Sequence, residues 1–383
     1  MENQIKKFKL DYDNTEHLAL VRAMGSKDKT VARQAQEIFA KFVGPVVSKL
    51  LSVQGTSSLI YTDLPFDEDG DPSFPLDLYY GTDDRHVSVW SQTMAGGLPT
   101  SEVRGMNEMK FSTYNLYSAV SFLSKYARQA RLDVVGGAVN RMAQEILLTQ
   151  ERNAWLVVLK ALADASSSDS FTNSTFDHII QSRTESVFVL DDLSRLITLV
   201  KRINASWAGG STDDFNSRGV TDIFVSPEIT EQIRGFVYNP MNVNNPAGGS
   251  AGATQDGIAL DDTTRREIFT AGGRQELFGI NIIDLNEFGT QRRYNSLFAE
   301  FAGNVAHSGT AFSTNDDEII VGLDLTRDAF VRPVERDGET GSTFNASIDN
   351  QFDVERRGKM GFWGSISEGR IGLDSRSVCG LVV

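Results

Sequence analysis

The sequence predicts an α+β fold, and three features of its patterning indicate this class. Residues 132–165 form the longest helical pattern, with apolar residues mostly at three- and four-residue steps. Residues 55–112 contain strand-like runs at 58–64, 76–80 and 86–93, separated by turn clusters. Further short strand-like runs follow residue 221, and we expect them to form a mostly antiparallel sheet together with helices.

The composition describes a globular protein that can bury a core. Of the 383 residues, 40% are apolar and 23% are charged. No run approaches the roughly 18 apolar residues of a membrane helix, and the charged N-terminus lacks the apolar stretch of a secretory signal. The single cysteine, Cys379, excludes an internal disulfide and a cysteine-based zinc site. It lies in a terminal apolar strand, where we expect it to be buried.

Charge is unevenly distributed along the chain. The net charge is −14, yet residues 1–50 hold nine Lys or Arg against six Asp or Glu, so the remainder carries −17. Two interpretations stay open: a solvated amphipathic leader, or a basic arm that faces a polyanion. The candidate residues for contact with a polyanion are Lys6, Lys7, Lys9, Arg22, Lys27 and Lys29.

The N-terminal region predicts one helix. Residues 1–25 are polar and we expect weak order there. Residues 26–43 have an amphipathic pattern, and Gly44-Pro45 is expected to end the helix. Its apolar stripe consists of Val31, Ala35, Ile38, Phe39 and Phe42.

Residues 55–112 are acidic and have few core-like runs, so they predict an extended β-hairpin that projects from a body. A two-stranded ribbon is marginally stable alone in water, so such an arm should lie on another surface. Asp67, Asp69 and Asp71 suggest a calcium loop. That loop needs Gly at its sixth position and Glu at its twelfth, where this chain has Pro72 and Leu78. An acidic turn is the better interpretation, and no metal site is expected.

The central helices follow this hairpin. Residues 109–131 predict a strand that leads into a short helix, and residues 132–165 predict the long helix. Gly136-Gly137 predicts that the regular part of this helix begins at or after the pair, or is distorted there. The core face of the long helix is expected to include Val139, Met142, Ile146, Trp155, Val158 and Leu159.

The C-terminal half alternates helices and strands. A helix is predicted at 191–204, a plain glycine-rich surface loop at 205–219, a strand at 221–226 and a helix from Pro227. After a Gly/Asn/Ala loop at 239–257, strand-like runs lie at 266–272, 276–285, 296–301, 318–325 and 329–335. More strands with tight glycine turns end the chain.

No pattern of catalytic residues emerges from the sequence. The four histidines, His17, His86, His178 and His307, are not spaced as metal pairs. Nucleophile, zinc-protease and phosphate-loop motifs are absent. The sequence therefore makes no positive case for an enzyme, and we expect no cofactor.

Three stretches in order resemble one family. They are residues 121–162 with the long helix, the strand–Ser-Pro-Glu–helix junction at 222–236, and the glycine-rich ending at 355–378. In this order they resemble the major capsid proteins of tailed bacteriophages, which have the Hong Kong 97-type fold.

This resemblance implies four parts. Residues 1–54 would form an N-terminal arm, and 55–112 an extended loop, called the E-loop. Residues 113–215 with part of 335–380 would form a peripheral domain around the long spine helix, and 216–334 an axial domain. Contacts between subunits would involve the E-loop residues Asp67, Asp69, Asp71, Asp83, Asp84 and Arg85.

The function implied is a structural one. Copies of the chain would form hexamers and pentamers that close into an icosahedral shell around double-stranded DNA, with portal, scaffolding and cement proteins as further partners and no membrane. The protein would be made in the host bacterial cytoplasm and reside in the virion capsid. No lysine lies between Lys49 and Lys110, so a covalent lysine crosslink from the E-loop, as some family members form, is excluded. The alternatives are an encapsulin-like compartment shell and a soluble α+β enzyme or ligand-binding protein.

Overall fold

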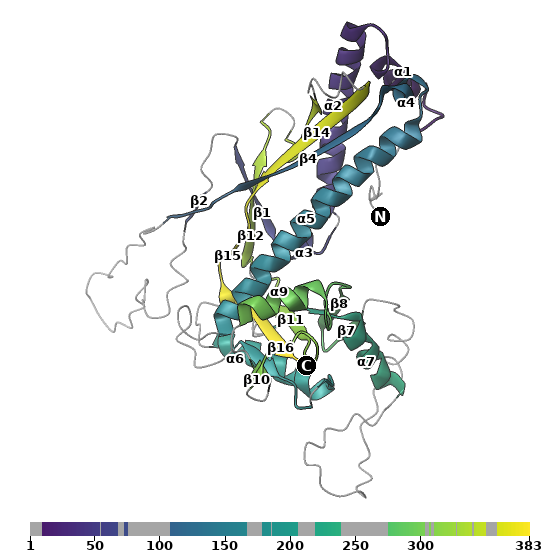
Figure 1. Ribbon diagram of the computed structural model, residues 1–383. Coiled ribbons are helices and arrows are strands. Elements are labelled where there is room, and N and C mark those ends of the chain that lie inside the picture. Colours follow the sequence, from purple (N-terminus) through teal and green to yellow (C-terminus); the bar gives the residue numbers. More distant parts are fainter. Residues whose placement is uncertain are drawn as a thin grey trace, which may run out of the picture. The chain divides into compact units, whose positions relative to one another are not determined.

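The structure is a computed structural model. It describes residues 10–53, 55–67, 73–75, 108–166, 178–184, 186–205, 219–238, 275–302, 306–307, 310–326, 328–338, 341–349 and 358–383. The predicted α+β class is confirmed (Figure 1). Within the described ranges, no helix is long and apolar enough to span a membrane. The strands predicted at 76–80, 86–93 and 266–272, and the loop at 239–257, lie outside these ranges.

The chain divides into two compact units. Unit 1 contains Met1–Pro75, Glu108–Ala154 and Phe330–Ile371. Unit 2 contains Leu76–Asn107, Trp155–Ala329 and Gly372–Val383. The division into four parts that the resemblance implies stays a prediction.

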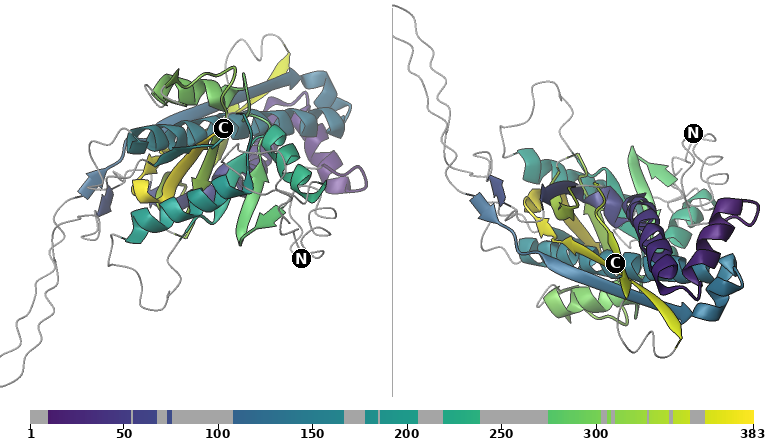
Figure 2. Two further views of the ribbon diagram at one scale, coloured as in Figure 1. Left: turned by 90° about the horizontal axis from the view of Figure 1, so that it is seen from below. Right: turned by 90° about the horizontal axis from the view of Figure 1, so that it is seen from above.

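Unit 1 begins with a helix that the sequence did not predict. Helix α1 covers Thr15–Met24, and the side chain of Asn14 caps it by accepting a hydrogen bond of 2.9 Å from the backbone N–H of Glu16. The expectation of weak order is wrong for residues 15–24, because Val21 and Met24 are buried in the core of unit 1, and residues 1–9 lie outside the described residues. Helices α1 and α2, both drawn in purple, lie next to each other (Figure 2).

Helix α2 covers Lys29–Val53 and runs through Gly44-Pro45. The predicted end at this pair is wrong, because buried residues continue beyond it at Val47 and Leu50. Gly44 also allows close packing, since a Cβ built there would lie 3.2 Å from the carbonyl oxygen of Phe344. Packing of the apolar face therefore outweighs the local helix-breaking signal.

A short helix and one sheet follow in unit 1. Residues Ser57–Ile60 form α3 where the sequence predicted a strand. Strand β1 (Thr62–Asp67) runs parallel to β12 (Phe330–Arg336) and so is not one half of the predicted hairpin. Strand β14 (Lys359–Glu368) pairs antiparallel with β12, with β13 (Asn345–Asp349) and, over ten residues, with β4 (Tyr114–Leu123). A separate antiparallel pair joins β2 (Ser73–Pro75) to β3 (Glu108–Lys110).

The long helix is confirmed. After the short helix α4 (Ser124–Arg128), α5 covers Leu132–Ser166, and the division between the two units falls within it. It passes without a break through Gly136-Gly137, so a start at or after this pair is wrong. Leu132 and Val135 are buried, and their packing offsets the low helix propensity of the glycines.

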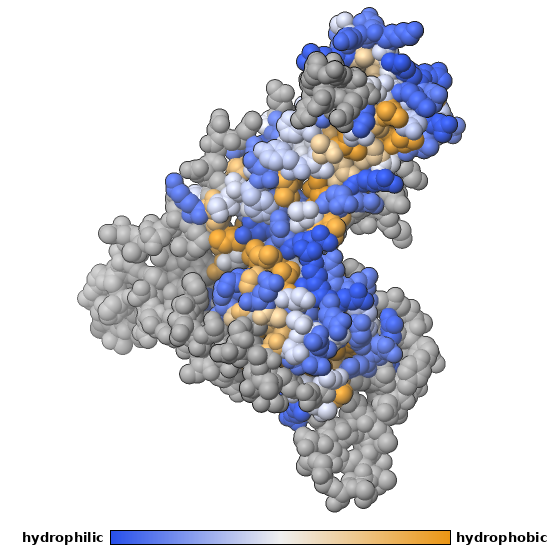
Figure 3. Space-filling view, viewed as in Figure 1, coloured by the Kyte–Doolittle hydropathy of each residue, from blue (hydrophilic) through white to orange (hydrophobic). Residues whose placement is uncertain are grey.

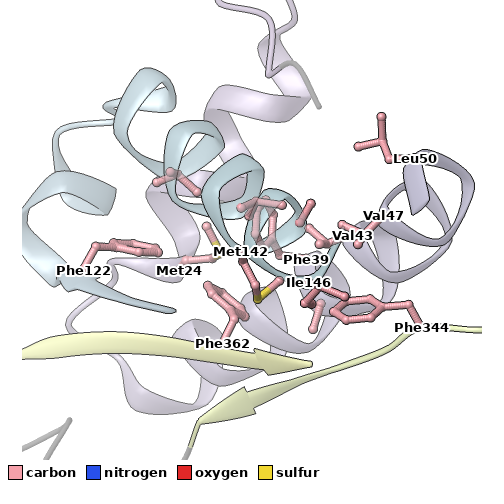
Figure 4. Packing of buried hydrophobic residues seen from close by; sticks show 14 of the residues in the cluster. Met24, Phe39, Val43, Val47, Leu50, Phe122, Met142, Ile146, Phe344 and Phe362 are labelled. Carbon is pink, nitrogen blue, oxygen red and sulfur yellow. The ribbon is translucent and has the colours of Figure 1, made fainter. Parts of the chain in front are cut away.

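The core of unit 1 lies between the helices and the sheet. Helices α1, α2 and α5 contribute one side and strands β4, β12 and β14 the other. Figure 4 shows Phe39 of α2 and Met142 and Ile146 of α5 gathered beside Phe362 of β14. The rings of Phe39 and Phe362 have centroids 5.2 Å apart, which is the range of favourable aromatic pairs.

Unit 2 contains a six-stranded sheet in the order β5 (Ile179–Gln181), β16 (Val378–Val382), β11 (Ile319–Leu323), β6 (Asp222–Val225), β8 (Ile280–Asp284) and β7 (Gln275–Leu277). The pairs β5–β16 and β6–β8 are parallel and the other three are antiparallel, which agrees with the predicted mostly antiparallel sheet.

The helices of unit 2 are α6 (Leu190–Ala205), α7 (Pro227–Tyr238) and α9 (Arg293–Ala302). The first two are confirmed. The strand predicted at 296–301 is wrong, because Tyr294 and Phe298, four residues apart, bury one face of α9. The remaining short elements are β9 (Ala306–His307), β10 (Thr310–Ala311), β15 (Ile371–Gly372) and the 3₁₀ helix Ser375–Ser377.

Candidate functional site

The predicted basic arm is only partly described. Arg22 in α1, Lys27 in the turn that follows and Lys29 at the start of α2 are all exposed. Lys6, Lys7 and Lys9 lie outside the described residues. Of the predicted E-loop residues, Asp67 is exposed at the end of β1. The others, Asp69, Asp71, Asp83, Asp84 and Arg85, lie outside the described residues.

The predicted core face of the long helix is buried. Val139, Met142 and Ile146 are 1–3% exposed in unit 1. In unit 2, Val158 and Leu159 are fully buried, and the ring of Trp155 packs against Phe224, Phe288 and Tyr294 at centroid distances of 4.9–5.5 Å.

A charged residue of the long helix has a structural role. Glu151 is only half-buried and accepts hydrogen bonds from the hydroxyl of Thr56 at 2.7 Å, and from the backbone N–H and hydroxyl of Ser57 at 2.9 and 2.7 Å. These bonds bring a carboxylate to the N-terminus of α3, where it is favourable. By contrast, Glu145 is exposed.

A buried polar network in unit 1 is centred on Glu368, the last residue of β14. Its side chain is 0% exposed. Oε1 accepts a hydrogen bond of 3.0 Å from the hydroxyl of Tyr114, the first residue of β4, and Oε2 accepts one of 2.9 Å from Nε2 of Gln150 in α5. Nη2 of Arg370 lies 3.4 Å from both carboxylate oxygens. The carboxylate is therefore both neutralised and hydrogen-bonded, which a buried charge requires.

A second arginine extends this network to β1. Arg332 on β12 places Nε 2.7 Å from Oδ1 of Asp63 and Nη2 2.8 Å from Oδ2, a two-pronged ion pair with its neighbour in the parallel strand register. Its Nη1 lies 3.9 Å from Oε2 of Glu368. The Arg332 side chain is 7% exposed, whereas that of Asp63 is 35% exposed at the edge of the network.

Arg370, the other arginine of the network, lies over the ring of Tyr61, and Tyr114 is also part of its surroundings. Cζ of Arg370 lies 4.8 Å from the ring centroid of Tyr61, and the Tyr61 hydroxyl donates to the backbone oxygen of Ala154 at 2.9 Å. Burial, and next the Glu368 carboxylate, raise the pKa of Tyr114 to about 12. Burial lowers the pKa of Arg370, but Glu368 and the two tyrosines outweigh this effect and raise it. Tyr114 is therefore a neutral donor and Arg370 a cation across the neutral pH range.

This network joins the two strands that flank the arm segment, which we define as residues 68–113 between β1 and β4. Asp63, near the start of β1, pairs with Arg332, and Tyr114, which directly follows the segment, bonds to Glu368. The antiparallel pairing of β2 with β3 joins the two sides of the segment again a few residues further out. Since the charges are paired and buried, the arrangement positions a segment of chain and presents no reactive group.

The sequence analysis missed this network. Arg332 interrupts the otherwise apolar run 330–334, which is a signal that a charge needs a buried partner. Glu368 lies at the end of its strand and carries no such signal. The identity of the partner of Arg332 had no local signal, because Asp63 and Arg332 are 269 residues apart in sequence.

Two further reactive side chains, His178 and Cys379, are buried. His178 is buried, with Nδ1 2.9 Å from the backbone oxygen of Val378. Cys379 is buried as predicted, and burial raises the pKa of its thiol. Within the described parts of the chain, no group of three or more His, Cys, Asp or Glu is arranged to hold a metal ion.

Comparisons with known proteins add a likeness at the level of fold. No family model and no curated protein matches this sequence. Solved structures do match. The capsid of the cyanophage P-SCSP1u is 15% identical with a TM-score of 0.46, over 84% of this chain and 86% of that chain. The capsid of Helicobacter pylori bacteriophage KHP30 is 10% identical with a TM-score of 0.44, over 86% and 90% of the two chains.

A third matching structure is an encapsulin and not a phage capsid. The SrpI encapsulin of Synechococcus elongatus PCC 7942 is 12% identical with a TM-score of 0.38, over 72% of this chain and 75% of that chain. At such identities the likeness concerns the fold and says nothing about site residues.

Proposed function

We propose that this chain is the shell-forming capsid protein of a tailed bacteriophage, with the Hong Kong 97-type fold. In this role it has no catalytic activity. Many copies form hexamers and pentamers, and each subunit adds several modest contacts that closure by symmetry sums into a stable particle.

The observation that carries this proposal is the anchored arm segment. A segment of 46 residues, 68–113, leaves from β1 and returns at β4, and both of these flanking strands contribute a residue, Asp63 or Tyr114, to one ion-pair network. Forming this ion-pair network costs the desolvation of several charges. We explain this cost by the need to position the strands from which the arm segment leaves. The segment is acidic and has few core-like residues, so it should pack on a surface outside its own chain.

The finer parts of the proposal concern partners and place. The exposed Arg22, Lys27 and Lys29, with Lys6, Lys7 and Lys9 before them, would face packaged double-stranded DNA, which basic residues bind without sequence preference. The acidic residues Asp67, Asp69, Asp71, Asp83 and Asp84, with Arg85, would contact a neighbouring subunit. The protein would be made in the bacterial cytoplasm and end in the virion, with portal, scaffolding and cement proteins as further partners.

Electron microscopy of the purified full-length chain tests this function. We expect closed particles or capsomers of uniform size, and sedimentation should give masses far above 42.2 kDa. A variant with residues 76–107 replaced by a short Gly/Ser linker should keep its circular dichroism spectrum and lose assembly. A wild-type chain that stays monomeric at high concentration and over a range of salt would contradict the proposal and favour the soluble enzyme or binding protein.

The contents of the particles separate a capsid from an encapsulin-like compartment. Particles isolated from their natural source should contain nuclease-protected double-stranded DNA of uniform length. Particles that instead contain a single folded cargo protein and no DNA would favour the compartment.

A further inference from the structure

Helix α2 buries one apolar face, and on another side it carries exposed apolar residues. Phe39, Val43 and Val47 are at most 3% exposed in the core of unit 1 (Figure 4). On another side of the same helix, Val31 is 43% exposed and Ile38 is 58% exposed. In Figure 3, apolar residues (orange) show between hydrophilic ones (blue) near the positions that Figure 1 labels α1 and α4.

The exposed residues form a seam. Val31, Ile38, Phe42 and Pro45 follow one another at steps of seven, four and three residues, which fits the heptad spacing of a coiled-coil face. Ala35, which lies between Val31 and Ile38 on this spacing, is 5% exposed and packs in the core of unit 1. Phe42 is 44% exposed, and the ring of His17 from α1 lies beside it at a centroid distance of 6.2 Å. A seam with this spacing fits a partner that is itself helical.

The charge of helix α2 indicates which kind of partner can bind the seam. Helix α2 contains four basic residues and one acidic residue. The acidic residue, Glu37, already has a cation beside it, because its Oε1 lies 3.5 Å from Nε of Arg33 in the same helix. Lys41, next to Phe42 in sequence, is exposed, as is Lys49, one helical turn beyond Pro45. The apolar seam is therefore bordered by positive charge.

This charge excludes two occupants on physical grounds. A second copy packed symmetrically on the seam would bring each basic border against another basic border, which is repulsive. A nucleic acid would satisfy the lysines, but its phosphates offer no apolar surface to cover Ile38 and Val31.

We propose that the exposed seam of α2 binds an acidic amphipathic helix of another protein. Apolar side chains of that helix would pack on Val31, Ile38 and Phe42, and its Asp or Glu side chains would pair with Lys41 and its neighbours. This inference does not rest on the proposed shell, because the seam is complete in one copy of the chain.

Binding of a synthetic peptide tests it. The probe is a fluorescent peptide of about four heptads with Leu at the a and d positions and Glu at e and g, titrated with the full-length protein and read by anisotropy. We expect saturable binding. Ile38→Ser should weaken it roughly tenfold or more, because this change replaces an aliphatic side chain of the proposed interface with a small polar one. Lys41→Glu should weaken binding by several fold, and Glu37→Gln should strengthen it.

Matched controls separate the seam from general effects. Tyr117→Ser changes a side chain that is 69% exposed on β4, away from α2, and should leave the affinity unchanged. The same peptide with Lys in place of Glu should not bind. All variants should keep the wild-type melting temperature, because the changed side chains are exposed.

Four results would overturn the inference. One is no binding of the acidic peptide, or binding that every variant retains. Self-association that Ile38→Ser abolishes would assign the seam to a second copy. Binding to vesicles of phosphatidylglycerol and phosphatidylcholine, with none to the peptide, would assign it to a lipid surface. Binding only to duplex DNA, insensitive to Ile38→Ser, would assign the lysines to a nucleic acid.

Discussion

The hydroxyl of Tyr114 lies 3.0 Å from Oε1 of Glu368, and the two residues face each other in the register of β4 and β14. This contact joins the point where the arm segment ends to the buried carboxylate that also neutralises two arginines. Glu368 therefore accepts hydrogen bonds from Tyr114, Gln150 and Arg370, and its Oε2 also lies 3.9 Å from Nη1 of Arg332.

The stability of unit 1 should depend on Glu368 more than on any single donor. Glu368→Ala leaves two buried guanidinium groups short of a counter-charge, so we expect a loss of about 3–5 kcal/mol in the free energy of unfolding. Tyr114→Phe removes one hydrogen bond to a charged acceptor and should cost about 1–3 kcal/mol. Urea unfolding followed by circular dichroism measures both. Tyr117→Phe, on the same strand but exposed, is the control and should change nothing. Equal losses for Glu368→Ala and Tyr117→Phe would refute a buried network.

Glu318 in unit 2 should make stability depend on pH. Burial raises the pKa of this carboxyl; the bond of 2.6 Å from the Ser226 hydroxyl opposes the shift, and the nearby Glu228 adds to it. Because the folded-state pKa lies above the unfolded value, the stability linked to this group is fully present below the unfolded pKa. It is lost as the pH rises through the folded pKa.

Glu318→Gln should remove this dependence. Denaturant unfolding at several pH values between about 4 and 7 should show the variant gaining stability relative to wild type as the pH rises. A difference between the two proteins that is constant across this range would show that Glu318 does not titrate with folding.

Two glycines in helices should respond oppositely to alanine. A Cβ at Gly137 of α5 would meet nothing within 4 Å, so Gly137→Ala should stabilise the protein by about 1 kcal/mol through helix propensity. A Cβ at Gly44 of α2 would lie 3.2 Å from the carbonyl oxygen of Phe344, so Gly44→Ala should give no gain or a loss. Thermal unfolding monitored at 222 nm compares them. A gain of the same size at both positions would show that α2 is not tightly packed against the residues before β13.

Gly364 should tolerate no side chain. A Cβ there would lie 1.9 Å from Cζ of Phe344, whose ring is 1% exposed in the core of unit 1. Gly364→Ala should therefore destabilise the protein by about 3 kcal/mol, through overpacking. Adding Phe344→Leu should recover part of this loss, since it shortens the side chain that clashes. Gly338→Ala, where nothing lies within 4 Å, serves as the neutral control.

Much of the secondary structure was predictable because its signals are local. Helices α5, α6 and α7 follow from apolar residues at three- and four-residue steps, and Ser226 with Pro227 marks the start of α7. The Ser226 hydroxyl accepts from the N–H of Ile229 at 3.1 Å, as a capping residue does. Buried residues of the long helix were predictable for the same reason, because periodicity alone places them on one face.

The errors arose where contacts between distant parts of the chain outweigh local preference. The run 296–301 is apolar enough for a strand, and only the packing of Phe298 against Phe312, with ring centroids 5.1 Å apart, shows which face of the helix is buried. Helix α2 continues past Gly44-Pro45 because the core accepts Val47 and Leu50 beyond that pair.

By itself, then, the sequence determined the mixed class of the fold, the long central helix, the Ser-Pro helix start and the uneven charge of the chain. Each of these depends on residues within a few turns of one another. Only the tertiary structure decided which charges are paired. Asp63, Tyr114, Arg332 and Glu368 come from four strands, and pairing β1 with β12 and β4 with β14 brings them together. The tertiary structure also decided that Ile38 is exposed, because the core of unit 1 covers a different side of helix α2.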